Sequence, residues 1–240
     1  PVRIIVESPW IKPQAQFADL RAFLDALEAS GDLATVDAPV DPNLELTEIS
    51  RRVLARGGPA LLFSNAGGGH VRVLTNLFGT TERVAAALGI DAETGFAELG
   101  RLLAALKTPE PPQGLGDAWH KLPLVREALK MSPREQRSAP CRDVVIKGDS
   151  VDFADWPIQT CWPEDAGPLI TWGLTTTRGP SASRQNLGIY RAQVIGRNRI
   201  IMRGLAHRGG AIDYQRWCAA RPDEPFPLAI SIGADPACVL

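Results

Sequence analysis

The residues most able to do chemistry lie along one predicted β-hairpin and the loop that follows it. Apolar and polar residues alternate over 189–195, and the turn-like segment 196–198 leads into an apolar return strand. Asn186 stands at the start of this hairpin, Arg191 within its first strand and His207 just after its second. Arginine offers a fixed fork for a carboxylate or phosphate, and an amide oxygen is a neutral ligand for a hard cation. The hairpin therefore indicates an anion site that a metal ion could share.

Each of these residues also has an ordinary structural explanation. Arg191 faces solvent if its side chain lies on a barrel exterior, and the alternation alone does not decide this. Asn186 before Leu-Gly can be a turn residue, and a lone His207 is often a capping or hydrogen-bonded histidine. Arg208 and Gly209 precede a predicted helix, where a guanidinium and backbone N–H groups can approach an anion. Loop glycines do not identify such a site by themselves.

The first half of the chain has the pattern of an α/β domain. We expect an irregular segment over 1–16, an α/β domain over 17–107 and a Pro-rich linker over 108–140 that holds a short helix near 124–130. Helical patterns cover 17–30, a segment capped by Asp41 with Pro42 at its first position, 81–88 and 93–107, and strand patterns cover 33–40, 60–63 and 71–74. Alternation of helices with strands is typical of a layered α/β fold.

The second half, 141–240, is predicted to be mostly β. The expected strands are 143–147, 170–177, 189–195, 199–203 and 227–233, with helices over 211–220 and from Asp235-Pro236 onward. Several short strands at this spacing indicate a small barrel or a strongly curved sheet. The predicted fold class is therefore α+β, with an α/β domain followed by an incomplete barrel.

The composition excludes several classes of function. The chain has 240 residues and a formal net charge of −1, which gives no general attraction to nucleic acid or anionic lipid. No apolar run approaches the roughly 20 residues needed to span a bilayer, and the first residues lack a signal-peptide pattern. The four cysteines form no C-x-x-C pair, so we expect reduced thiols, a cytoplasmic location and no structural zinc site.

The motifs in 186–191, 203–210 and 161–165 together resemble the UbiD family of prenylated-FMN-dependent decarboxylases, and the resemblance runs from about residue 17 to 240. It implies an α/β domain, a central flavin-binding split β-barrel and a C-terminal domain beyond this chain. It also implies that Arg191 is catalytic and that Asn186 and His207 bind a divalent metal such as Mn²⁺. The implied cofactor contacts are Ile189, Tyr190, Arg191, Arg203, Gly204, Leu205, Arg208 and Gly209.

The resemblance further implies a reaction, the non-oxidative decarboxylation of 4-hydroxy-3-polyprenylbenzoate to 2-polyprenylphenol in ubiquinone biosynthesis. Prenylated FMN would serve as the electron sink, and Arg191 would orient the carboxylate. The family's acidic proton donor and a third metal ligand, a Glu, would lie beyond Leu240, so we expect no turnover from these 240 residues alone. The alternative is a flavin- or phosphate-binding barrel without turnover.

Assembly and location follow only by implication. Family members assemble as hexamers, partly through a C-terminal region beyond residue 240, so a homo-oligomer is the expected state of the family protein. A polyprenyl tail is insoluble in water, which implies peripheral contact with the inner face of the cell membrane. No amphipathic stretch in the sequence indicates that contact independently.

Overall fold

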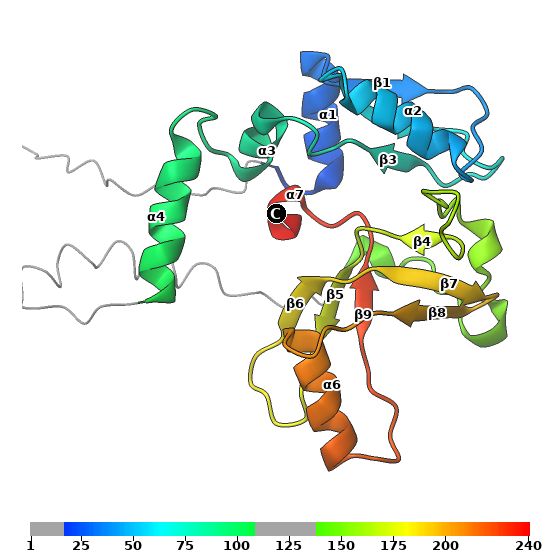
Figure 1. Ribbon diagram of the computed structural model, residues 1–240, viewed down its shortest axis with the longest axis vertical. Coiled ribbons are helices and arrows are strands. Elements are labelled where there is room, and N and C mark those ends of the chain that lie inside the picture. Colours follow the sequence, from blue (N-terminus) through cyan, green and yellow to red (C-terminus); the bar gives the residue numbers. More distant parts are fainter. Residues whose placement is uncertain (1–16, 109–137) are drawn as a thin grey trace, which may run out of the picture. The chain divides into compact units, whose positions relative to one another are not determined.

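The computed structural model describes residues 17–108 and 138–240, and their elements are shown in Figure 1. These residues fall into two compact units, one made of Phe17–Gly79 with Ile146–Leu240 and the other containing the described part of 80–145. These units are defined by contacts between residues. The domain boundaries predicted after residues 107 and 140 were based on composition, and they differ from the unit boundaries at 79/80 and 145/146. The irregular segment predicted over 1–16 and the short helix predicted near 124–130 lie outside the described residues.

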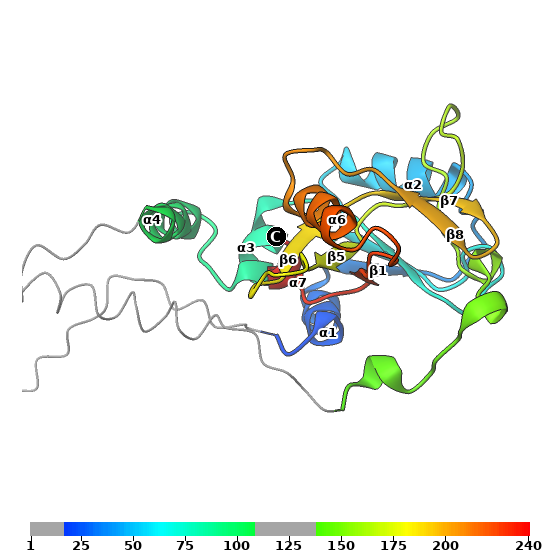
Figure 2. The same ribbon diagram turned by 90° about the horizontal axis from the view of Figure 1, so that it is seen from below.

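The larger unit begins with a three-stranded sheet between two helices. Strand β1 (Leu33–Val36) pairs in parallel with β2 (Ala60–Phe63), which pairs antiparallel with β3 (Val73–Thr75). Helices α1 (Leu20–Ser30) and α2 (Glu45–Leu54) cover opposite faces of this sheet (Figure 2). Because both faces are covered, every residue of β2 is buried, as its continuous apolar sequence predicts.

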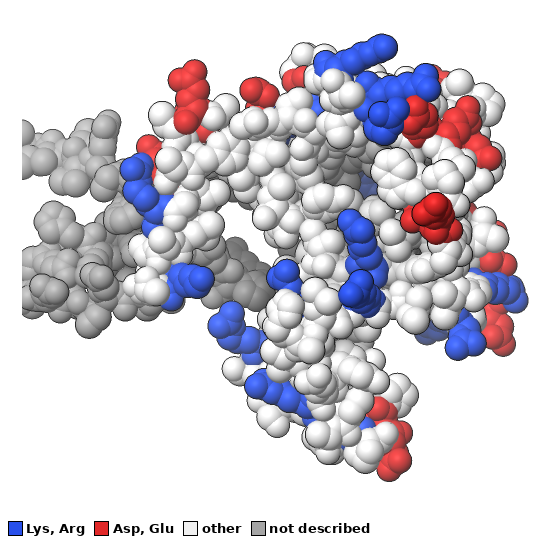
Figure 3. All heavy atoms as spheres, in the orientation of Figure 1, with Lys and Arg blue, Asp and Glu red and all other residues white. Residues whose placement is uncertain are grey.

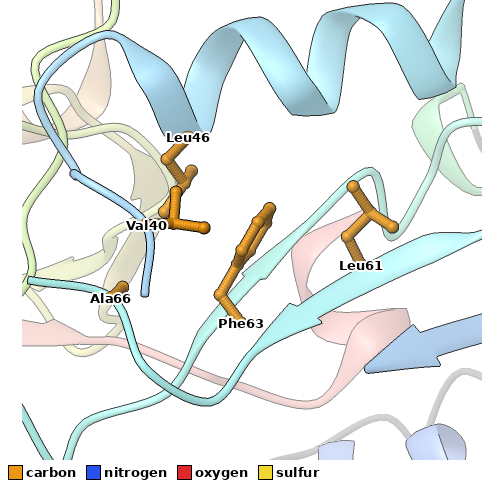
Figure 4. Packing of buried hydrophobic residues seen from close by; sticks show 5 residues of the cluster. All are labelled: Val40, Leu46, Leu61, Phe63 and Ala66. Atoms are coloured by element: carbon orange, nitrogen blue, oxygen red, sulfur yellow. The ribbon is translucent and has the colours of Figure 1, made fainter. Parts of the chain in front are cut away.

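The core of this layer lies between β2 and α2. Side chains alternate across a strand, so Leu61 and Phe63 point from β2 toward the same face. They form one cluster with Val40, Leu46 and Ala66, and Phe63 and Leu46 have no exposed surface. Figure 4 shows the Phe63 ring directed toward α2, between Leu61 on one side and Val40 and Leu46 on the other.

Local capping interactions set the ends of several helices. The Asp19 side chain accepts a hydrogen bond from the Ala22 N–H (3.0 Å) at the start of α1. Gly31 ends the same helix at φ +79°, in the left-handed region that glycine adopts without strain. In the smaller unit, Thr80 caps α3 (Thr81–Leu88) in the same way, and α4 covers Gly95–Lys107.

The predicted start of α2 at Asp41-Pro42 is wrong, because the helix begins at Glu45. The Pro42 carbonyl accepts a hydrogen bond from the Thr160 N–H (3.2 Å), and the Leu44 N–H donates to the Thr160 carbonyl (2.9 Å). These bonds to a distant segment hold the chain before α2 out of the helix, and Leu44 has a φ of +70°. Asp41 instead accepts a bond from the Asn43 N–H (2.8 Å), which forms a turn.

An acid-sensitive ion-pair cluster lies on α2. Glu48 accepts hydrogen bonds from Arg51 Nε and Arg52 Nε, each at 2.7 Å, and Figure 3 shows acidic and basic groups side by side in this region. The bond from Arg51, followed by that from Arg52, lowers the pKa of Glu48 from 4.5 to about 2. A carboxyl with a lowered pKa stabilises the fold fully above its unfolded pKa, and this contribution is lost as the pH falls toward the folded pKa.

We therefore expect the Tm advantage of the wild type over Glu48→Gln to shrink as the pH falls from about 5 to about 2. Thermal unfolding of both proteins across this range measures the gap, and added salt should reduce it because the cluster is exposed. Glu28→Gln changes an exposed acid of α1 and serves as the control. A gap that does not change with pH would contradict the assignment.

The rest of the larger unit contains two three-stranded antiparallel sheets. One has the order β4-β7-β8, with β4 at Leu169–Ile170, β7 at Ala192–Gly196 and β8 at Arg199–Met202. The other has the order β6-β5-β9, with β6 at Asn186–Ile189, β5 at Leu174–Thr177 and β9 at Ala229–Ser231. Helix α6 (Gly209–Ala220) packs on β6 and β5, and the chain ends with the single turn α7 (Pro236–Val239). The sheets do not close into a barrel among the described residues, and the predicted α+β class is confirmed.

Two strands that the sequence predicts as continuous are each divided between these sheets. The segment 170–177 splits into β4 and β5, and 186–195 splits into β6 and β7, so the chain changes sheets twice. At the crossing, the Tyr190 N–H donates to the Gly173 carbonyl (3.5 Å). A Cβ on Gly173 would lie 2.6 Å from Ile230 Cγ2, so only glycine lets the bend pass so close to β9. The β7–β8 hairpin is confirmed, with a bulge between Val194 and Gly196.

The strand predicted over 143–147 is absent. A 3-10 turn, η1 (Pro140–Arg142), precedes this segment, and the 3-10 turns η2 (Gly148–Ser150) and η3 (Phe153–Asp155) follow it. Val144 and Val145 are 79% and 62% exposed, because no neighbouring strand pairs with them among the described residues. Apolar content alone therefore predicted a strand that has no sheet to join.

Two whole-chain expectations concern cysteines and membrane spans. All four cysteines are free thiols, and three of them are exposed. Within the described ranges, none of the helices combines the length and apolar character that a bilayer crossing requires.

Candidate anion-binding site

The main candidate site is a cavity of about 630 Å³ at the point where the chain crosses between the two sheets. Strand β6 forms one wall, Tyr190 and Arg191 lie at the crossing, and the segment after β8 closes the cavity at the start of α6. The lining residues are Asn186, Leu187, Gly188, Ile189, Tyr190, Arg191, Arg203, Leu205, Arg208 and Gly209. All of them come from one continuous stretch of the chain.

The structure brings together eight of the ten residues singled out by the sequence. The two exceptions are Gly204 and His207, which are exposed and absent from the cavity lining. Leu187 and Gly188 line the cavity although no role was predicted for them. The proposed roles of the individual residues stay predictions, because a shared cavity establishes proximity and not function.

The cavity carries an excess of positive charge. Three guanidinium groups line it, those of Arg191, Arg203 and Arg208, and all three residues are exposed. None of them has an ion-pair partner in 17–108 or 138–240, and no acidic side chain is part of the lining. Guanidinium groups without an ion-pair partner favour a ligand with a phosphate or carboxylate group, because they can donate two parallel hydrogen bonds to it.

The N-terminus of α6 adds a second source of positive potential. Arg208 occupies the N-cap position but makes no side-chain cap bond, so the first N–H groups of this 12-residue helix are not capped by it. The Gly210 N–H donates to the Tyr190 hydroxyl (2.8 Å). With Gly209 in the cavity lining, the positive end of the helix dipole faces the same space as the three arginines.

Two glycines allow the cavity wall to pack closely on α6. A Cβ on Gly209 would collide with the amide of Asn186, with Cγ only 2.7 Å away. A Cβ on Gly210 would lie 2.8 Å from the Tyr190 hydroxyl oxygen. Glycine is therefore required at both positions by close approach, and the Gly209-Gly210 pair has a structural reason that its sequence alone does not reveal.

A buried hydrogen-bond chain supports Asn186 from behind. Asn186 Nδ2 donates to Thr177 Oγ1 (3.2 Å), and Thr177 Oγ1 donates to Asp213 Oδ2 (2.8 Å). Thr177 and Asp213 are only 3% and 8% exposed. The sequence did not predict either residue for the site. The helix predicted over 211–220 starts earlier, at Gly209, so Asp213 lies in its second turn.

The loop 160–165 interacts electrostatically with Arg191. Burial raises the pKa of the Cys161 thiol, with the nearby Asp165 acting in the same direction and the Arg191 guanidinium opposing both. The Asp165 carboxylate accepts a bond from the Trp162 N–H (3.0 Å), which closes the loop into a turn. Arg191 therefore lies within electrostatic range of a loop that is joined to the segment before α2 through Thr160.

The donor set fits an anionic cofactor better than a metal ion. Three guanidinium groups, a helix N-terminus and a glycine cradle suit a phosphate. No cluster of three or more His, Cys, Asp or Glu side chains that could hold a metal occurs in the part of the chain that the structure describes. A second cavity, of about 510 Å³, is lined mainly by small residues of 179–182 and α6, together with Arg216.

Two family models match separate parts of the chain. Residues 24–103 match the family model described as the 3-octaprenyl-4-hydroxybenzoate carboxy-lyase N-terminal domain, and residues 133–240 match that of the Rift-related domain of the same carboxy-lyase. Together these matches cover most of the chain.

Solved structures of UbiD-class enzymes share this fold. The enzyme HmfF from Pelotomaculum thermopropionicum, in complex with FMN, is 30% identical, with a TM-score of 0.69 over 90% of this chain and 43% of its own. The 3,4-dihydroxybenzoic acid decarboxylase AroY from Klebsiella pneumoniae is 29% identical, with a TM-score of 0.69 over 91% of this chain and 43% of its own.

The vanillic acid decarboxylase of Sedimentibacter hydroxybenzoicus, in its closed form, is 28% identical, with a TM-score of 0.71 over 93% of this chain and 44% of its own. The chain thus spans less than half the length of the solved structures that it matches. Because two domain models of one family match the chain and UbiD-class structures share its fold, the chain belongs to the UbiD family.

Proposed function

We propose that the cavity binds prenylated FMN and that this chain is the cofactor-binding part of a decarboxylase acting on an aromatic acid. This proposal rests on three guanidinium groups beside the N-terminus of α6, which have no ion-pair partner and no acidic neighbour in the cavity lining among the residues that the structure describes. The match to UbiD-class structures, one of which contains FMN and another prenylated FMN, supports the choice of cofactor.

The lining residues divide into a polar and an apolar part. Arg203, Arg208 and the backbone of Gly209 would hold the phosphate through charge-assisted hydrogen bonds. Leu187 and Ile189, which are 54% and 40% exposed, would offer apolar surface to a ring system. The predicted contacts of Tyr190, Gly204 and Leu205 belong to the same proposal.

Arg191 is proposed as the catalytic residue. Loss of CO₂ from an aromatic carbon leaves an unstable anion, and prenylated FMN supplies the electron sink for it when bound. The guanidinium of Arg191 would hold and polarise the substrate carboxylate in a fixed orientation. A proton must then return to carbon, and no carboxyl group of the described residues lines the cavity to donate it.

The metal assignment is a separate part of the proposal. Asn186 Oδ1 is an amide oxygen of the kind that divalent cations accept, and His207 is the second predicted ligand. Asn186 is in the cavity lining whereas His207 is not, so this pair would need a further ligand to bind Mn²⁺ firmly. The affinity for Mn²⁺ would therefore depend more on ligands from the cofactor phosphate than on ligands from the described protein residues.

The substrate is proposed to be 4-hydroxy-3-polyprenylbenzoate, which would place the enzyme in ubiquinone biosynthesis. Relatives named for vanillic acid and 3,4-dihydroxybenzoic acid support a hydroxylated aromatic acid in general, and the polyprenyl tail is the more specific part of the proposal. A polyprenylated substrate would bring the protein from the cytoplasm to the inner face of the membrane.

Assembly as a homo-oligomer is proposed from the family, and light scattering would test it.

Binding of FMN without turnover is the second candidate function. The absence of an acidic side chain from the described cavity lining favours it for this chain. Incubation with prenylated FMN, Mn²⁺ and a hydroxylated aromatic acid separates the two: release of CO₂ supports a complete enzyme. Cofactor binding without CO₂ release supports the binding function.

Titration of FMN with Mn²⁺ present, followed by flavin fluorescence, tests the cavity directly. Loss of one charge-assisted bond is worth about 1.5–3 kcal/mol, so Arg203→Ala and Arg208→Ala should each weaken FMN binding about tenfold or more. Arg199→Ala removes an equally exposed guanidinium from β8 that does not line the cavity, and it should leave binding unchanged. Equal weakening in all three variants would mean that only general charge attracts FMN. No binding by the wild type would refute the proposed function.

A further inference from the structure

We propose that Asp213 is a positioning residue that determines which end of the Asn186 amide faces the cavity. The two residues do not touch, and Thr177 connects them. Thr177 and Asn186 are directly paired across β5 and β6, and Asp213 reaches the same pair from α6, which packs on both strands. The consequence of this arrangement for ligand binding rests on the function proposed above, but the arrangement itself does not.

The direction of the hydrogen bonds follows from donor and acceptor chemistry. The Thr177 hydroxyl has a single proton, which it donates to Asp213 Oδ2 (2.8 Å). The Thr177 oxygen then has only lone pairs left for Asn186, and these require an N–H donor. Asn186 must therefore present Nδ2 to Thr177 (3.2 Å), since the opposite amide orientation would place two acceptors against each other.

The packing around α6 agrees with this orientation. Of the Asn186 amide atoms, Oδ1 lies nearest to the Cβ position of Gly209, and Nδ2 lies furthest from it. The oxygen is therefore on the side of the cavity and the helix N-terminus. Asp213 is itself confined, because a Cβ on Gly179 would be 3.1 Å from its Oδ1. Two glycines thus allow the close contacts that the hydrogen-bond chain needs.

The chain of bonds gives the cavity a fixed acceptor among its many donors. An amide free to rotate would offer either C=O or NH₂ to a ligand, and beside three guanidinium groups an NH₂ would add only another donor. With Asp213 in place, Asn186 offers C=O, which is the end that can meet a cation bridging to a phosphate. Asp213 does this without touching the ligand.

Exchange of side-chain amide protons with water tests the orientation without any ligand. In ¹H–¹⁵N spectra, the Asn186 signal is identified by its loss in Asn186→Ala, and exposed Asn43 serves as the internal reference. We expect Asn186 in the wild type to exchange at least about tenfold more slowly than Asn43. Thr177→Val and Asp213→Asn should bring its exchange to the rate of Asn43. Thr177→Val removes the oxygen that accepts from Asn186, and Asp213→Asn no longer fixes the direction of the Thr177 hydroxyl, because an amide can donate as well as accept. Thr177→Ser keeps the hydroxyl and should keep the protection.

Asp223→Asn removes an exposed acid just beyond α6 and controls for the loss of charge. Fast exchange of Asn186 in the wild type would overturn the proposal, and so would unchanged protection in folded Asp213→Asn. Equal loss of protection in Thr177→Ser and Thr177→Val would overturn it as well. Because the wild-type and Thr177→Ser measurements stand alone, the proposal is tested even if a more severe variant does not fold.

A second measurement connects the amide to the ligand. FMN affinity measured with and without Mn²⁺ gives the part of binding that depends on the cation. Asp213→Asn should reduce this part about tenfold and leave affinity in the absence of Mn²⁺ unchanged, whereas Thr177→Ser should change neither. Affinities that fall equally with and without Mn²⁺ would contradict a role through the amide oxygen. If the wild type binds no FMN at all, the proposed function fails, while the exchange experiment still decides the role of Asp213.

Discussion

Replacing Phe63 with alanine is expected to lower the free energy of unfolding by about 3–5 kcal/mol, the usual range for a buried aromatic residue in a core. Phe63 has no exposed surface, and its backbone is paired with Val36 on one side and Val73 on the other. The strands on both sides prevent the backbone from closing the gap, so a cavity should remain beneath α2. Since domains are stable by only about 5–15 kcal/mol, this one change should remove a large part of the total.

Chemical denaturation of the wild type and Phe63→Ala measures this difference. Leu54→Ala is the matched control, because Leu54 is 43% exposed at the end of α2 and belongs to the same compact unit. We expect the control to change stability by less than about 0.5 kcal/mol. A loss of similar size in both variants would mean that the core beneath α2 does not hold this unit together.

Replacing Gly209 with alanine is expected to weaken FMN binding more than tenfold. The added Cβ would occupy the position of the Asn186 amide, so Asn186 or the start of α6 must move. Either movement disturbs the bond from Asn186 to Thr177 and withdraws the helix N-terminus from the cavity. Overpacking of this kind costs about 1–3 kcal/mol, so a lower Tm should accompany the loss of affinity.

Gly100→Ala provides the same substitution where there is room for it. Gly100 lies inside α4, and a Cβ there meets no atom within 4 Å. Alanine favours helix, so this variant should keep FMN affinity and be slightly more stable than the wild type. Flavin fluorescence and thermal unfolding of both variants give the two quantities. Unchanged FMN affinity in Gly209→Ala would show that close packing at α6 is not needed for binding.

Local signals predicted the parts of the fold that local chemistry determines. The helical patterns over 17–30 and 81–88 were predicted close to their observed ends, because the caps at Asp19, Gly31 and Thr80 lie within a turn of the helices that they limit. The start of α2 was wrong because its cause, the pairing with Thr160, lies more than a hundred residues away in the chain. The break at Gly173 was missed for the same reason, since only the approach of β9 requires it.

The site shows the same limit. The residues that line the cavity were largely predicted because they lie in one stretch whose motif resembles a known family. Thr177 and Asp213 were not, although they are buried and bonded to each other. Nothing in the sequence relates a threonine at the end of β5 to an aspartate on α6, because only the packing of α6 on the sheet brings them together.

The crossing between the two sheets has a consequence for transferring this site to another protein. All the lining residues lie between Asn186 and Gly209, so a transplant of that stretch alone would carry the whole lining. Such a graft would leave behind Thr177, which holds the Asn186 amide, and Asp213, which holds Thr177. The smallest portable unit therefore runs from Gly173, where the chain bends between the sheets, to Asp213.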